Sequence, residues 1–134
     1  MTESTTQAES VLDQYLGFWN AGAEEEQRRL AAAVFTQGVE YRAQIGVLSG
    51  APALMDFRKQ FAARMGTVAL RPRRKPDVHH DRARLQWEIL TGDGAGTSFA
   101  TGTDVLQFDE DGRISAVTVF LDRAPEGFDA AAHD

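Results

Sequence analysis

The sequence predicts an α+β fold, in which N-terminal helices pack on a curved, mostly antiparallel sheet. Three observations predict it. Apolar residues recur at helical spacing through most of the first 65 residues. After Gly66 the pattern changes to the two-residue alternation of strands. Short turns rich in glycine and aspartate join the alternating segments, as in an antiparallel meander. A curved sheet over helices forms a cone whose open mouth suits a small molecule.

Three helices are expected. The first carries an apolar stripe that ends at Asn20–Gly22; its members are Val11, Leu12, Tyr15, Leu16, Phe18 and Trp19. The second begins with three glutamates at 24–26, which suit a helix N-terminus and precede two arginines. Its buried side would hold Leu30, Val34 and Phe35. The third starts near Pro52 and ends at Gly66, and it would bury Leu54, Phe57, Phe61 and Met65.

Five strands are expected, one before the third helix and four after it. They cover residues 39–44, 68–75, 82–89, 97–108 and 113–121. Turns are predicted at 92–94 and at 109–112. The stretch from Asp77 to Arg82, which contains His79 and His80, is predicted to be a further hairpin turn rather than a metal site.

Composition limits the possible functions. The 134 residues suffice for one domain, with a core at about 8–123 and mobile ends. The net charge of -6 argues against nucleic acid as a partner, and the chain has no cysteine for disulfides or thiolate chemistry. No apolar run is long enough for a membrane span, and residues 1–10 do not resemble a signal peptide. We therefore expect a cytoplasmic protein that acts on a small molecule or on another protein.

Asp104 is the first candidate for chemistry. It stands in the middle of a strand, where aspartate is unfavourable. If it shares a face with Gly102 and Leu106, it points into the cone, where burial raises the pKa of a carboxyl and keeps it protonated. Such a group donates a hydrogen bond or moves a proton. The alternative is an aspartate that faces solvent or a turn amide.

Other residues carry weaker signals. Aromatic side chains are expected in the core, with some of them lining the cavity and binding the ligand: Trp19, Phe57, Phe61, Trp87 and Phe120. A histidine of the 79–80 pair could reach the pocket as an acid or base. The basic run at 71–75 is expected on a solvated sheet face, with an anion site as the minor alternative.

Several strings resemble the ketosteroid-isomerase-like superfamily, which includes SnoaL-like polyketide cyclases, ketosteroid isomerases and nuclear transport factors. The most specific string runs from Gly102 to Ile114 and contains Gly-Thr-Asp-Val and Asp-Gly-Arg-Ile. The supporting strings are Tyr15-Leu16 with Trp19-Asn20, and Val34-Phe35 before Val39-Glu40-Tyr41. The resemblance covers roughly residues 8–123 and implies a single SnoaL-like domain, a cone-shaped α+β barrel and a homodimer.

The resemblance also implies roles for individual residues. Asp104 matches the protonated aspartate of the ketosteroid-isomerase oxyanion hole, and Tyr15 matches its tyrosine. The position of that family's aspartate base is occupied here by Tyr41. Glu40 is one residue away and should face the other side of the sheet. Proton transfer of the steroid type by that carboxylate is therefore not expected, and Tyr41 would add a second phenol to the pocket.

These observations leave three functions open. The first is an enzyme of the SnoaL-like cyclase or isomerase type, with Asp104, Tyr15 and Tyr41 as catalytic residues acting on a hydrophobic carbonyl compound. Proton transfer and enolate stabilisation would need neither cofactor nor metal. The second is a protein that binds a hydrophobic ligand in the same pocket without chemistry. The third is a protein-interaction domain, which would need an exposed apolar patch on the sheet.

Overall fold

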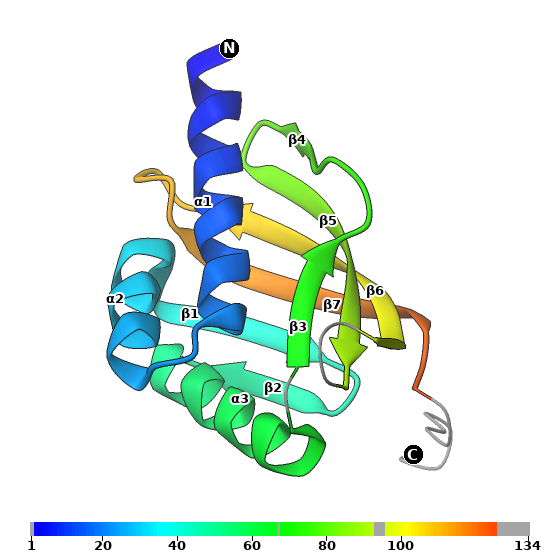
Figure 1. Cartoon of the computed structure of the whole chain (residues 1–134). Coiled ribbons are helices and arrows are strands. Elements are labelled where there is room, and N and C mark those ends of the chain that lie inside the picture. The colour runs from blue at the N-terminus through cyan, green and yellow to red at the C-terminus, as the bar shows by residue number, and fades with distance from the viewer. Residues whose placement is uncertain (1, 67, 93–95, 126–134) are drawn as a thin grey trace.

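Three helices pack against one curved seven-stranded sheet in the computed structural model, which describes residues 2–66, 68–92 and 96–125, with side chains from residue 7 onward (Figure 1). The elements are α1 (Thr2–Asn20), α2 (Glu24–Val34), β1 (Phe35–Ala43), β2 (Gly46–Ser49), α3 (Ala51–Met65), β3 (Val68–Pro72), β4 (Asp77–His79), β5 (Arg82–Thr91), β6 (Thr97–Phe108) and β7 (Ile114–Arg123). The predicted α+β class, with helices on a curved and mostly antiparallel sheet, is confirmed.

The strands follow the order β2-β1-β7-β6-β5-β3, and β4 pairs with the first residues of β5, Arg82–Arg84. All neighbours are antiparallel except β1 and β7, which run parallel. The Asp109–Gly112 hairpin between β6 and β7 is confirmed, with Gly112 at φ 82°. The turn expected at 92–94 lies mostly outside the described residues.

The sequence did not predict two short strands. β2 has four residues, three of them exposed, so no alternating pattern marks it. The strand expected over 68–75 ends at Pro72, and residues 77–79 form β4 separately. Two prolines, at 72 and 76, explain the break, because a proline cannot donate to a sheet ladder. Phe35, expected on the second helix, instead begins β1.

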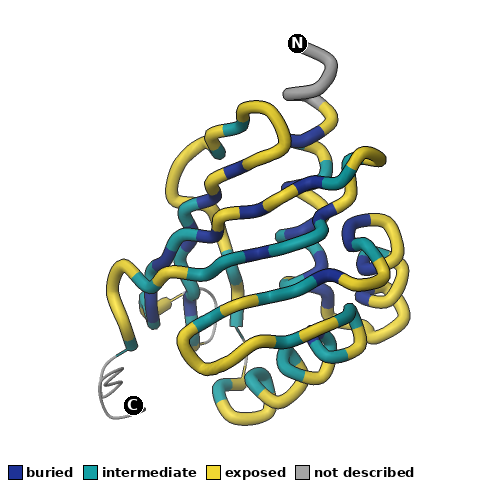
Figure 2. Tube along the Cα trace, turned by 180° about the vertical axis from the view of Figure 1, so that it is seen from behind, coloured by how far each residue is buried: buried dark blue, intermediate teal, exposed yellow. Residues whose placement is uncertain are grey.

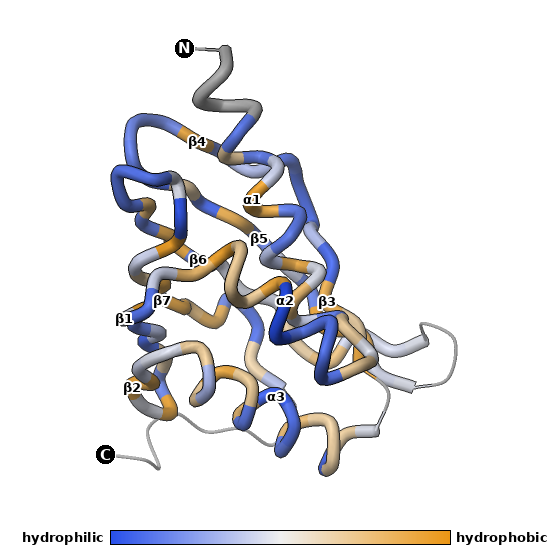
Figure 3. Tube along the Cα trace, turned by 90° about the vertical axis from the view of Figure 1, so that its left-hand side faces the viewer, coloured by the Kyte–Doolittle hydropathy of each residue, from blue (hydrophilic) through white to orange (hydrophobic). Residues whose placement is uncertain are grey.

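The core lies between α1, α2 and the concave face of the sheet. Figure 2 shows buried residues alternating with more exposed ones along the strands, and Figure 3 shows the hydrophilic, glutamate-rich start of α2. The largest fully buried side chains are Tyr15, Phe18, Leu12, Leu54, Leu85, Leu106, Ile114, Val34, Val39 and Val117. Within the described part of the chain, no helix is both long enough and apolar enough to cross a membrane.

Candidate functional site

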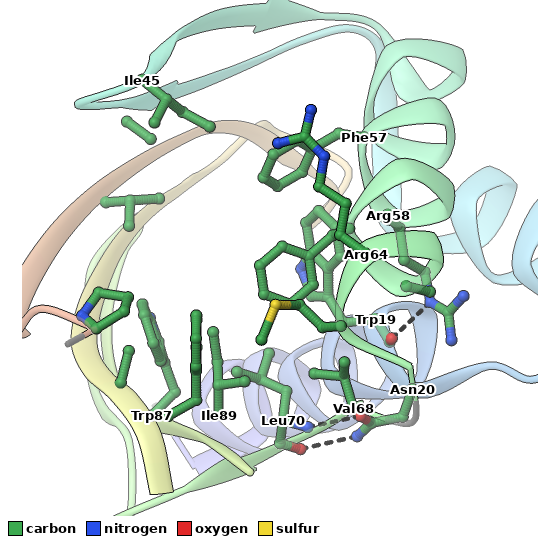
Figure 4. Close-up of a pocket in the computed structure, with 18 of the residues that line it drawn as sticks. Trp19, Asn20, Ile45, Phe57, Arg58, Arg64, Val68, Leu70, Trp87 and Ile89 are labelled. Atoms are coloured by element: carbon green, nitrogen blue, oxygen red, sulfur yellow. Dashed lines mark hydrogen bonds between the residues drawn. The ribbon is translucent and has the colours of Figure 1, made fainter. Parts of the chain in front are cut away.

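An apolar pocket of about 770 Å³ lies between α3 and the concave face of the sheet (Figure 4). Its aromatic lining comes from Trp19, Tyr41, Phe57, Phe61, Trp87 and Phe99. Four of the five aromatic residues expected at a ligand site are among them. The pocket also contains one carboxylate, that of Asp104, and two arginines of α3. A cavity with apolar walls and few polar groups is typical of a small-molecule site.

Phe120 is the exception among those five residues. It is 57% exposed and is absent from the pocket lining. Its neighbours on β7, Val119 and Leu121, line the pocket instead. Successive side chains of a strand point to opposite faces, so Phe120 lies on the outer face of the sheet, as does the partly exposed Val105. The homodimer expected from the resemblance stays a prediction.

Asp104 is the only charged residue among the buried residues of the described chain, at 2% exposure. It shares the inner face of β6 with Gly102 and Leu106, as the alternation predicts. Both carboxylate oxygens accept hydrogen bonds. The Tyr15 hydroxyl donates to Oδ2 at 2.6 Å, and the Trp87 indole Nε1 donates to Oδ1 at 2.7 Å. Each oxygen keeps a free lone pair, since a carboxylate has about four acceptor positions.

Burial raises the pKa of Asp104 from 3.8 to about 6, because desolvation penalises its charged form. The hydrogen bonds from Tyr15 and Trp87 act in the opposite direction and lower this pKa. At pH 7 roughly ten carboxyls are ionised for each protonated one. The raised pKa agrees with the sequence-based expectation. The expectation also included a protonated carboxyl, whereas a pKa of about 6 leaves most of the Asp104 carboxyls ionised at pH 7. With two donors aimed at it, the ionised form of Asp104 is favoured at neutral pH.

The same pKa predicts how stability varies with pH. In the folded protein Asp104 binds its proton more tightly than in the unfolded chain, so its stabilising contribution is complete below about pH 4 and is lost as the pH rises through about 6. The shift corresponds to about 3 kcal/mol. Urea unfolding of wild type and Asp104→Asn at several pH values measures it. The difference between their unfolding free energies should change by about that amount, in favour of the variant at high pH. A pH-independent difference would contradict the assignment.

Tyr15 lies beneath the pocket rather than in its wall. The side chain is fully buried, is absent from the pocket lining, and packs edge-on against Trp19 and Phe35. Burial, followed by the charge of Asp104, raises its pKa well above the usual value for tyrosine. Its hydroxyl therefore stays protonated and donates to Asp104. In this structure the hydroxyl holds the carboxylate of Asp104. The expected role of Tyr15 as a direct partner of a substrate oxygen stays a prediction.

Tyr41 is the phenol that faces the cavity. Its ring lies against Trp19 and Phe57, with centroids 5.6 Å and 6.4 Å away. Burial and the charge of Asp104 raise its pKa well above the ordinary value, so the hydroxyl keeps its proton. That hydroxyl makes no hydrogen bond within the described residues. As expected, Glu40 turns to the other face of the sheet. There it pairs with Arg42 at 2.7 Å.

Gly102 makes the contact between Trp87 and Asp104 possible. Trp87 and Gly102 are opposite each other in the β5–β6 register, and the indole ring lies over the glycine. A Cβ at position 102 would lie 2.3 Å from Cζ2 of Trp87 and 2.8 Å from the carbonyl oxygen of Phe120. Sequence periodicity does not reveal this relation between Gly102 and Trp87. The available signal was a glycine inside a strand, which marks a close approach.

Two polar side chains hold the C-terminal end of α1 and thereby position Trp19. Arg58 of α3 donates from Nε to the Trp19 carbonyl at 2.7 Å, which satisfies a free carbonyl at the helix end. Asn20 accepts from the Leu70 N–H and donates to the Leu70 carbonyl, both at 2.8 Å, so it joins β3 like an extra strand residue. Sequence periodicity gives no information about such long-range bonds.

The histidines and the basic run lie outside the pocket. His79 and His80 are exposed at the predicted β4–β5 hairpin, where His80 has φ 51°. This turn conformation brings their Nδ1 atoms within 3.2 Å of each other, contrary to the opposite orientations expected on a strand. No metal-binding cluster of three acidic or histidine side chains occurs in the described ranges. In the basic run, Arg71 forms an ion pair with Glu88. Arg73 forms one with Asp122.

The fold and the pocket together define an α+β protein in which helices cover a curved sheet and enclose an apolar pocket. The chain belongs to the SnoaL-like domain family, whose model matches residues 12–117. No curated protein matches the sequence.

Solved structures agree with this family. A protein from Agrobacterium tumefaciens, described as a candidate isomerase of the SnoaL-like family, is 26% identical over 87% of this chain and 98% of its own, with a TM-score of 0.79. A candidate polyketide cyclase from Sinorhizobium meliloti is 13% identical over 83% and 94%, with a TM-score of 0.65. A protein of ketosteroid-isomerase-like fold from Catenulispora acidiphila, solved with trimethylamine, is 13% identical over 90% and 95%, with a TM-score of 0.68. The last two likenesses concern the fold alone.

Proposed function

We propose that this protein is an enzyme of the SnoaL-like isomerase or cyclase type, which performs acid/base chemistry on a hydrophobic carbonyl compound. One observation carries the proposal. A carboxylate held at both oxygens by buried donors faces an apolar cavity that also contains an unpaired phenol. A structural aspartate would need no cavity, and a cavity for passive binding would need no buried charge. The candidate isomerase from A. tumefaciens supports the same direction.

In the proposed reaction Asp104 acts as the base and Tyr41 as the hydrogen-bond donor. The carboxylate of Asp104 takes a proton from the carbon next to the substrate carbonyl. The electron pair of that C–H bond forms a C=C bond, and the π pair of the carbonyl moves onto its oxygen. The Tyr41 hydroxyl donates a hydrogen bond to this oxygen as its negative charge develops. Asp104 then returns the proton to a different carbon. In the cyclisation, the enolate carbon instead attacks a second carbonyl of the same molecule, and Asp104 returns the proton to the alkoxide oxygen that forms there. A pKa of about 6 suits a base that works near neutral pH.

Turnover of apolar ketones tests this proposal. Purified protein is incubated with a panel of β,γ-unsaturated ketones and of diketones that can close a ring, and conjugation is followed by ultraviolet absorbance. The proposal expects at least one class to react, with a rate that rises as the pH passes through about 6 because Asp104 must be ionised. Saturable binding of these ketones, with no reaction of any of them at any pH, would contradict it.

Replacing Tyr41 with Phe should lower kcat by about 10²- to 10³-fold, the range seen when one oxyanion donor is removed. Stability should change little, because the hydroxyl bonds to no described residue. Tyr15→Phe is the matched comparison: it removes a donor from Asp104, so it should raise the pKa of Asp104 and move the pH profile upward. Carboxyl NMR titration and kcat measurements separate the two. Equal pH profiles for the two variants would place both phenols in the same role.

The second candidate function is ligand binding without chemistry in the same pocket. One observation favours it: the Tyr15 hydroxyl already donates its hydrogen bond to the Asp104 carboxylate, so it has no proton to donate to a substrate oxygen. Both tryptophans of the chain line the pocket, so their fluorescence reports occupancy directly. A ligand that changes this fluorescence and is recovered chemically unaltered would favour binding alone.

A further inference from the structure

The two cations of the pocket differ in what they contact. Arg58 and Arg64 both belong to α3 and both line the cavity. Arg58 is committed to the end of α1 through its bond to the Trp19 carbonyl. Arg64 lies in the last turn of α3 and is exposed. None of the ion pairs or side-chain hydrogen bonds found within the described residues involves it.

Arg64 lies at the open end of the pocket. Figure 4 shows its side chain leaving α3 on the cavity side, along the wall that carries Phe57. The exposed lining residues near it in the chain or across the opening are neutral: Gln44, Ile45 and Gly66. Figure 1 shows the C-terminal end of α3, the β1–β2 turn and the start of β3 at the same end of the molecule. Among the described exposed residues of the lining, Arg64 is therefore the single charged one, and it has no described acidic partner.

Arg58 is held at the end of α1, so the two remaining charges of the pocket are the buried Asp104 and the exposed Arg64. Asp104 is buried at the inner end, and the walls between it and the opening are largely aromatic and aliphatic. An anionic group would be repelled by the Asp104 carboxylate and attracted by the Arg64 guanidinium. A guanidinium also presents several N–H donors in a plane, which suits a carboxylate or a phosphate. This arrangement orients an elongated anion in one direction only.

We propose that the ligand of this pocket is an amphipathic anion, whose apolar body fills the aromatic cavity and whose carboxylate or other anionic group binds Arg64 at the opening. The inference deepens the proposed function by naming the substrate class, and it rests on that function only in calling the ligand a substrate. With the anionic group at Arg64, the opposite end of the molecule is the part presented to Asp104 and Tyr41.

Calorimetric titration with matched acid and amide probes tests the inference. The probes are phenylacetate, 1-naphthylacetate and decanoate, each paired with its neutral amide. Wild type should bind the carboxylate of at least one pair about tenfold more tightly than the amide, a difference of about 1.4 kcal/mol. Arg64→Gln should make the two affinities equal, and Arg64→Glu should reverse the preference. Raising the salt concentration should weaken the binding of the carboxylate probes and not that of the amides, because the ion pair with Arg64 is exposed and therefore screened.

Arg74→Gln is the matched control. Arg74 is also exposed, is not part of the pocket lining, and gives the same change in net charge. It should keep the wild-type preference. The inference is overturned if no carboxylate binds, if each amide binds as tightly as its acid, or if Arg64→Gln keeps the wild-type ratio; in the last case Arg64 only complements the dipole of α3.

This result is independent of turnover. A preference for carboxylates that depends on Arg64, in a protein that transforms no ketone, would refute the proposed chemistry and keep the inference. Turnover of neutral ketones, together with no effect of Arg64→Gln on carboxylate binding, would support the proposed chemistry and refute the inference about Arg64.

Discussion

Asp104→Asn should lower turnover by about 10²- to 10⁴-fold, the usual contribution of a positioned general base. The amide has no basic lone pair near neutral pH, so it cannot accept the proton from the substrate carbon. Steady-state kinetics with a ketone from the reactive class measures the loss. KM should change much less than kcat, because the carboxylate acts on the transition state rather than on the bound substrate.

The Asn variant should still fold, for a reason that the hydrogen bonds supply. The Trp87 indole can only donate, so the amide oxygen must face Nε1. The amide N–H then points to the Tyr15 oxygen, which can accept. Circular dichroism and thermal unfolding check this. Asp104→Leu is the contrasting variant, since it leaves two buried donors without partners and should be strongly destabilised. Full turnover by a folded Asn variant would refute the role of Asp104.

Gly102→Ala should destabilise the protein by about 2.5–6 kcal/mol. The new methyl would lie 2.3 Å and 2.6 Å from two atoms of the Trp87 ring and 2.8 Å from the Phe120 carbonyl oxygen. Overpacking of this kind costs about 1–3 kcal/mol. The indole must also move, which removes its hydrogen bond to a charged partner, worth about 1.5–3 kcal/mol. The pKa of Asp104 should therefore rise further, and carboxyl NMR titration will detect the change.

Gly38→Ala is the matched control for this substitution. Gly38 is also a strand glycine, in β1, and an added Cβ there meets nothing within 4 Å. Urea unfolding should show almost no loss for it. The double variant Gly102→Ala/Trp87→Phe should be more stable than the sum of the single changes predicts, because the smaller ring relieves the contact. Additive losses would mean that the clash with Trp87 is not the cause.

The carboxylate of this site is assembled from segments distant in the chain. Asp104 comes from β6, its donors come from α1 and β5, and the free phenol comes from β1. The Tyr15–Asp104 bond alone spans 89 positions. Changes in helix packing should therefore alter the chemistry of Asp104 as directly as changes beside it in the sequence.

Local periodicity predicted most of the elements and three of the inward orientations. The alternation in β6 placed Asp104 on the inner face, and the same rule separated Tyr41 from Glu40. Helical spacing placed Tyr15 on the buried stripe of α1. Periodicity did not predict the short exposed strands β2 and β4, because their four and three residues are too few to show a pattern. The prediction that Phe120 lines the pocket is wrong, because its place in the alternation of β7 puts it on the outer face, where it is 57% exposed.

The sequence by itself determined the fold class, the family and the residue types available to the site, because these depend on spacing along the chain. The charge state of Asp104 was decided only by the tertiary structure. Burial raises its pKa, while a phenol and an indole brought from elsewhere lower it, and the balance of these terms depends on distances between atoms that spacing does not specify. The same holds for Gly102 beneath Trp87 and for Arg64 at the opening, whose surroundings exist only once the sheet has curved around α3.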